Sequence, residues 1–128
     1  MNRVVMRSPL GRALGLGPAR DGVEDWWRER VSAAALVPLT GWFAVSIVTH
    51  AADGYSAVIA WLRSPITTIL MTLLLITLFH HTALGLQVVI EDYVHSRIKI
   101  PVLVGVRLGC FALGIAGLVA ILRIAFGP

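Results

Sequence analysis

Charged residues and cysteines are scarce in this sequence. Charged side chains make up 14% of the 128 residues, and Cys110 is the single cysteine. One cysteine excludes a disulfide within the chain and any metal or iron–sulfur site built from several cysteines. Ordinary soluble domains carry about 25% charged residues, so a soluble domain is also excluded. The chain has no Gly-rich phosphate loop and no flavin-binding pattern, so it is not expected to be an enzyme by itself.

Apolar residues are abundant instead and are gathered in three runs. Hydrophobic residues make up 57% of the chain, and the mean hydropathy is +0.81. Residues 31–50 and 64–90 contain no Asp, Glu, Lys or Arg, and residues 100–122 contain only Arg107. Each run is long enough to cross about 30 Å of hydrocarbon, which takes about 20 helical residues. The sequence therefore predicts an all-α integral membrane protein.

The runs divide the chain into a tail and a membrane domain. We expect residues 1–30 to form a cytoplasmic tail and residues 31–128 a domain of three transmembrane helices. Pro38 and Gly41 fall inside the first apolar run and predict a kink there, which a helix bundle tolerates because neighbours satisfy the freed backbone groups. The predicted helices cover about residues 31–50, 65–93 and 100–124.

Residues 22–30 carry an amphipathic pattern within the tail. Val23, Trp26, Trp27 and Arg30 recur at helical spacing and predict a short helix at the membrane interface, with the two indole rings at headgroup depth. We expect Trp26 and Trp27 to do no more than anchor this segment at the membrane interface.

The basic residues predict how the chain is oriented. Eight Lys and Arg residues lie in the tail and in the loop between the second and third runs, against two in the first loop and after the third run. By the positive-inside rule the N-terminus is cytoplasmic and the C-terminus periplasmic, in a bacterial inner membrane. A mitochondrial inner membrane is the alternative, because residues 1–20 carry arginine and no acid, as a presequence does. Nucleic acid is not an expected partner.

Ionisable side chains stand out in the second apolar run. His81 and Asp92 are 11 positions apart, which is about three turns plus 20°, so they share one helix face about 16 Å apart. An imidazole in a bundle can hold haem iron, and a carboxylate beside the Tyr93 phenol can serve a quinone with hydrogen bonds and protons. The plainer alternatives are an interhelical hydrogen bond for His81 and an interfacial role for Asp92 and Tyr93. We expect that plainer role for His80.

Two motifs carry a resemblance to a known family. His81 is followed after ten residues by Asp92-Tyr93-Val94, and the segment GVEDWWRERVSA, residues 22–33, places Arg30 five positions after an acid. This pattern resembles the small hydrophobic membrane anchor of succinate dehydrogenase. The resemblance extends over nearly the whole chain, and the histidine to Asp-Tyr spacing is its specific part.

The resemblance implies a role for each of four residues. His81 matches an axial ligand to haem b, whose second ligand is a histidine of the other anchor protein in the complex. Tyr93 matches the residue that hydrogen-bonds ubiquinone, and Asp92 is the adjacent acid of the same site. Arg30 matches an arginine near a haem propionate. The neighbouring His80 leaves open which imidazole binds iron, and the spacing favours His81.

The implied assembly is succinate:quinone oxidoreductase, respiratory complex II, which links the tricarboxylic acid cycle to the respiratory chain. Its other parts are a flavoprotein subunit, an iron–sulfur subunit that supplies the electrons, and a second membrane anchor subunit that shares a helix bundle with this chain. Two alternatives remain open. One is a small proton-conducting or transporter subunit without haem, and the other is an anchor that serves assembly alone.

Overall fold

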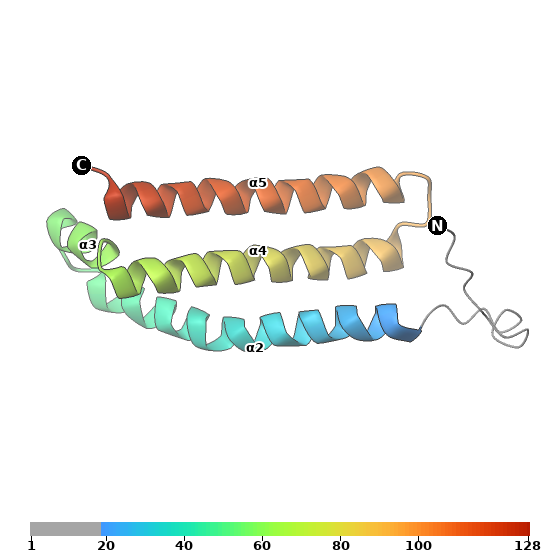
Figure 1. Ribbon diagram of the computed structural model, residues 1–128, viewed down its shortest axis with the longest axis horizontal. Coiled ribbons are helices and arrows are strands. Elements are labelled where there is room, and N and C mark those ends of the chain that lie inside the picture. The colour runs from blue at the N-terminus through green and yellow to red at the C-terminus, as the bar shows by residue number, and fades with distance from the viewer. Residues whose placement is uncertain (1–18) are drawn as a thin grey trace, which may run out of the picture.

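The structure, a computed structural model, describes the backbone of residues 19–128 and the side chains from residue 23 on. Three long helices lie side by side, with a short helix at one end (Figure 1). The middle helix, α4, packs against both α2 and α5. Within residues 19–128, three helices are long and apolar enough to cross a membrane, which confirms the predicted all-α class. The helices are α2 (Ala19–His50), α3 (Tyr55–Leu62), α4 (Pro65–Tyr93) and α5 (Lys99–Phe126).

Helix α2 begins earlier than the first predicted span. Residues 22–30, predicted as a separate interfacial helix, are continuous with the membrane span in one helix. No proline or glycine lies between Val23 and Val37, so nothing in that stretch interrupts the backbone hydrogen bonds. The remainder of the tail, residues 1–18, lies outside the described residues.

Helix α2 is bent along its length and is not straight (Figure 1). Pro38 lies inside it and has no N–H to donate to the preceding turn. Two residues on, the Thr40 hydroxyl donates to the carbonyl oxygen of Leu36 at 2.6 Å. Proline in a helix interior is a common cause of such bends, and the sequence predicts a kink at this point.

Helix α3 was not predicted, and it closes the end of the molecule where α2 meets α4. Gly54 precedes it with extended backbone angles, φ −69° and ψ 160°. The indole of Trp61 stacks on the His50 imidazole at the end of α2, with ring centroids 4.5 Å apart. Arg63 donates hydrogen bonds to the carbonyl oxygens of Ile124, Gly127 and Pro128, each at 3.1 Å. This end of the bundle is therefore held by side chains from the loop between the first two spans.

Helices α4 and α5 approach closely at two glycines. A Cβ atom built on Gly117 would lie 2.8 Å from Leu75 Cδ2, and one on Gly114 would lie 3.6 Å from Phe79 Cδ2. Small residues of this kind let membrane helices pack with their backbones near each other. Gly117 is thus the position at which this contact tolerates a side chain least.

We expect Gly117→Leu to destabilise the α4–α5 pair by about 1–3 kcal/mol, because the added carbons must displace Leu75 from a packed contact. Thermal unfolding of the detergent-purified protein measures the loss. Gly105→Leu is the matched control, since a Cβ atom there meets nothing within 4 Å. Equal loss in the two variants would show that the Gly117 contact is not what holds the helices together.

Few side chains are buried within the described residues. Leu74 and Ile90 are the buried apolar residues, at 9% and 8% exposure, and Ser32, Ser46 and Thr67 are the buried polar ones. Most apolar side chains of the three spans point outward. This is the pattern of a chain that places its helix faces against lipid or other subunits.

Candidate functional site

His81 lies on α4 and meets α2 through Ser32. The Ser32 Oγ and His81 Nδ1 atoms are 3.0 Å apart, and the same hydroxyl donates to the Glu29 carbonyl oxygen at 2.9 Å. A hydroxyl has one hydrogen to donate. With that hydrogen given to Glu29, Ser32 Oγ would accept a proton that His81 carries on Nδ1. The other ring nitrogen, Nε2, then keeps its lone pair and is the atom available to a metal.

Both partners of the hydrogen bond between Ser32 and His81 are at least partly shielded from the surroundings. Ser32 is only 6% exposed, and His81 is half-buried. Ser32 is in the run of residues 22–33 that carries part of the resemblance, but nothing in the sequence singles it out, because its partner is 49 positions away. It is the main site residue that sequence reasoning missed.

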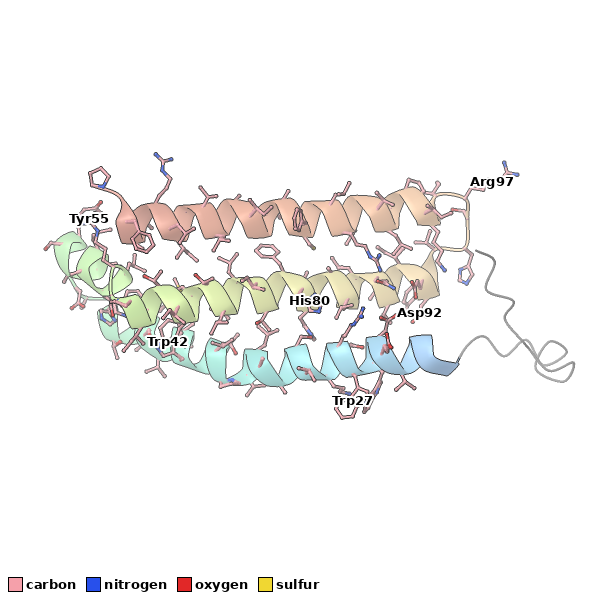
Figure 2. The ribbon with its side chains drawn as sticks, viewed as in Figure 1. Trp27, Trp42, Tyr55, His80, Asp92 and Arg97 are labelled. Atoms are coloured by element: carbon pink, nitrogen blue, oxygen red, sulfur yellow. The ribbon has the colours of Figure 1, made fainter. Side chains whose placement is uncertain are left out.

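Asp92 and Tyr93 are the last two residues of α4, and both are exposed. Tyr93 is 81% exposed. Since α4 is unbroken from Pro65 to Tyr93, the 11-position spacing puts His81 and Asp92 on one face about 16 Å apart, as predicted. Figure 2 shows Asp92 and Arg97 at one end of the bundle and Tyr55 at the other. The carboxylate and the phenol therefore stand at the end of the molecule that carries the second loop.

The structure does not bring Arg30 to the imidazole. Its guanidinium carbon lies 5.4 Å from the centroid of the Trp26 ring, a cation–π contact within α2. Trp26 in turn makes an edge-to-face contact with Trp27, with ring centroids 5.3 Å apart. Arg30 is exposed, so its guanidinium is free to leave this position when another group is near.

His80 points to a different neighbourhood from His81. It is exposed and lines a groove of about 580 Å³ between α4 and α5, whose lining includes Arg28, Gln87 and Arg107. Arg107 donates to the Gln87 side-chain oxygen, and the Gln87 amide nitrogen donates to a Glu91 carboxylate oxygen at 2.9 Å. The sequence marks Arg107 as an interruption of an apolar run, but it does not show that Gln87 is its partner.

The donor set fits one kind of metal site. Among residues 23–128 no group of three or more His, Cys, Asp and Glu side chains is placed to hold a metal ion. A haem iron is held by its porphyrin and needs only an axial nitrogen from a protein helix. A lone imidazole with a free Nε2 and a hydrogen-bonded Nδ1 has the chemistry of such a ligand.

Comparisons with known proteins identify the family to which the chain is similar. Residues 5–121 match the family model described as succinate dehydrogenase/fumarate reductase transmembrane subunit. The succinate dehydrogenase hydrophobic membrane anchor subunit of Rickettsia bellii is 28% identical over 116 residues, which is 90% of this chain and 93% of the relative. The protein of the same name from Paracoccus denitrificans is 29% identical over 86 residues, which is 67% of each chain.

No solved structure matches the chain. The family match covers most of the sequence, including the whole of α4 with His81, Asp92 and Tyr93. The resemblance stated from those residues is therefore confirmed. The chain belongs to the family of succinate dehydrogenase and fumarate reductase transmembrane subunits.

Proposed function

We propose that the chain is the hydrophobic membrane anchor of a succinate:quinone oxidoreductase, that it helps to hold a b-type haem through His81, and that Asp92 and Tyr93 form part of the quinone site. The relatives are anchor subunits of succinate dehydrogenase by name, and the three spans suit that role. The observation that carries the haem assignment is the hydrogen bond between Ser32 and His81 Nδ1.

His81 would bind iron through Nε2. A histidine ligand to a metal usually donates its other ring N–H to a protein acceptor, which fixes the orientation of the ring and raises the basicity of the ligating nitrogen. Ser32 provides that acceptor from a neighbouring helix. When bound, a haem supplies a one-electron redox centre within the membrane. A histidine of the second membrane anchor would complete the axial pair, and Arg30 would leave the Trp26 ring for a propionate.

Asp92 and Tyr93 would meet the quinone at the inner membrane face. The Tyr93 hydroxyl can donate a hydrogen bond to a quinone carbonyl, and the Asp92 carboxylate can orient it or pass a proton from the cytoplasm. Their exposure at the end of α4 suits a pocket that other subunits complete, with the iron–sulfur subunit as the source of electrons. The flavoprotein subunit would oxidise succinate outside the membrane.

The basic residues support a location in a bacterial inner membrane with the N-terminus in the cytoplasm. The loop that follows Tyr93 carries Arg97 and Lys99, which suits the cytoplasmic side by the positive-inside rule. The C-terminus would then be periplasmic. In a mitochondrial inner membrane the same ends would face the matrix and the intermembrane space.

Purification of the full chain from its native membrane, with identification of the proteins that accompany it, tests the assembly. We expect a flavoprotein, an iron–sulfur protein and a second small membrane protein, together with a reduced-minus-oxidised haem b spectrum. A chain that purifies without these proteins and without haem would overturn the proposal. A proton flux through vesicles that hold only this chain would then favour the proton-conducting alternative.

We expect Ser32→Ala to keep haem but to hold it about tenfold more weakly, because the outer partner of a ligating histidine typically contributes about 10–100-fold to metal affinity. Loss of the Nδ1 acceptor makes Nε2 a poorer electron donor to ferric iron, so the haem midpoint potential should rise. A redox titration and the rate of haem loss measure these effects. Ser32→Thr keeps the hydroxyl and should behave as the native chain does.

Ser46→Ala is the matched control for this substitution, since Ser46 is equally buried on the same helix, at 8% exposure. It should change neither the potential nor the rate of haem loss. If Ser32→Ala behaves like Ser46→Ala while His81 still binds haem, the hydrogen bond to Ser32 has no influence on the iron.

A further inference from the structure

The groove that contains His80 is built from two matching stripes of side chains. On α4 the lining residues run from Ile76 to Gln87, and on α5 they run from Arg107 to Leu118. Within each stripe they recur at helical spacing over 11 positions, so the groove extends about 16 Å along the helices. Because α4 and α5 are antiparallel, Gln87 and Arg107 lie together at one end. Apolar side chains line most of the remaining length.

The groove lies on a different side of α4 from the proposed redox face. At about 100° per residue, His80, Leu84 and Gln87 project about 60–120° away from His81 on the helical wheel. Asp92 projects within about 20° of His81. Haem and quinone at the His81–Asp92 face would therefore lie on a different side of α4 from the groove. Phe111 and Ile115 on the wall are 68% and 46% exposed.

The polar end of the groove lies toward the end of the bundle that carries the α4–α5 loop, because Gln87 is near the end of α4 and Arg107 is near the start of α5. Arg28 precedes Ser32 by about one turn, and Ser32 meets His81, so Arg28 reaches the same depth from α2. Long basic side chains near the end of a span extend toward the headgroups, so both guanidiniums can meet a lipid phosphate.

Both guanidiniums have donors left for a ligand. A guanidinium offers five N–H donors, and Arg107 uses one nitrogen, Nη2, to donate to Gln87. Arg28 lies 3.9 Å from carboxylate oxygens of Glu24 and Asp25, in exposed pairs that hold it weakly. A phosphodiester suits such a pair of arginines because guanidinium and phosphate form charge-assisted hydrogen bonds. The apolar length below them suits a hydrocarbon chain.

We propose that this groove is a binding site for an anionic glycerophospholipid of the inner leaflet. The phosphate lies between Arg28 and Arg107, and one acyl chain lies along the α4 and α5 stripes, past Phe111 toward Leu118. The lipid neutralises Arg107, whose charge would otherwise face the membrane at the edge of the hydrocarbon. The site does not depend on whether His81 binds haem.

Cys110 lines the groove and is the single cysteine of the chain, so a maleimide adduct found on this chain by mass spectrometry reports whether the groove is occupied. The assay uses the purified assembly, stripped of lipid by detergent and then given phosphatidylglycerol or phosphatidylcholine with the same acyl chains. Phosphatidylglycerol should protect Cys110 at lower concentrations than phosphatidylcholine. Inorganic phosphate should not protect it, because it has no chain to fill the groove. Native mass spectrometry counts the bound lipid in parallel.

Arginine variants test whether the two guanidiniums are what favours phosphatidylglycerol over phosphatidylcholine. We expect Arg28→Gln and Arg107→Gln each to weaken phosphatidylglycerol binding about fivefold, since one basic residue near an anionic lipid contributes about 1 kcal/mol. Arg97→Gln is the matched control, because Arg97 is an exposed arginine in the α4–α5 loop and does not line the groove. It should leave lipid binding unchanged.

Three results would overturn the proposal. The first is equal protection of Cys110 by the two lipids, and the second is an equal loss of binding in Arg97→Gln and Arg107→Gln. The third is full protection of Cys110 in the assembly after lipid is removed, which would show that a protein surface covers the groove.

Discussion

Replacing His81 with leucine should abolish the haem b spectrum of the assembly. Leucine has no nitrogen to bind iron, and the porphyrin would keep at most the ligand from the second membrane anchor. The buried Ser32 hydroxyl would also lose its partner across the helices. We therefore expect the reduced-minus-oxidised difference of the purified assembly to fall to background.

The neighbouring histidine provides the matched control. His80→Leu makes the same change one position away, on a side chain that faces the α4–α5 groove and not α2. It should retain the full spectrum. If His80→Leu loses the haem and His81→Leu keeps it, the ligand assignment is wrong, although the anchor role would stand. Quantifying every protein of the assembly in both variants separates loss of haem from loss of assembly.

Replacing Tyr93 with phenylalanine should slow quinone reduction by about 100-fold, because loss of one hydrogen-bond donor to a reacting carbonyl oxygen typically costs about 10²–10³-fold. The substitution removes one hydroxyl from an exposed ring at the end of α4, so it should not disturb packing. Succinate oxidation by an artificial dye, which takes electrons before the quinone site, should be unchanged. The ratio of the two activities in the same preparation is the measurement.

The chain contains one other tyrosine, and it serves as the control. Tyr55 is 84% exposed, at the opposite end of the bundle (Figure 2). Tyr55→Phe should leave both activities unchanged. A parallel loss of quinone and dye reduction in Tyr93→Phe would mean that the phenol supports the assembly as a whole and has no direct role at the quinone.

The three spans were predictable because the hydrocarbon of the membrane dictates the length and the composition of any helix that crosses it. A helix that crosses hydrocarbon must be long and nearly free of charge, and residues 31–50, 64–90 and 100–122 satisfy both conditions. The end of α4 at Tyr93 also agrees with the predicted boundary, since acids and basic residues cluster there. These features depend on local composition alone.

The start of α2 and the presence of α3 were harder to predict. A change from polar to apolar composition near Val31 suggests a boundary, but the backbone continues helical through it because no residue breaks the hydrogen bonds. Residues 55–62 are apolar and too short to span, so their composition does not distinguish a helix from a loop. The Trp61 stack on His50, which holds α3 in place, joins residues from separate helices.

The part of the candidate site that lies on one helix was predictable, and the contacts between helices were not. The spacing of His81 and Asp92 gives their common face directly, because helical geometry relates residues 11 positions apart. The partners Ser32 and Gln87 depend instead on how α2 and α5 pack against α4. Side-chain pairing of this kind is decided by tertiary structure, and a single sequence contains no measure of it.

The scarcity of buried side chains has a consequence for the cell. Leu74 and Ile90 are the apolar residues of the described part that packing within this chain removes from its surroundings. An orphaned copy would present the polar edge of His81 toward lipid, which lowers the stability of its helices in the bilayer. A protein of lower stability is unfolded more often and is cleared by proteases. The abundance of this protein should therefore follow the synthesis of its partners more closely than its own.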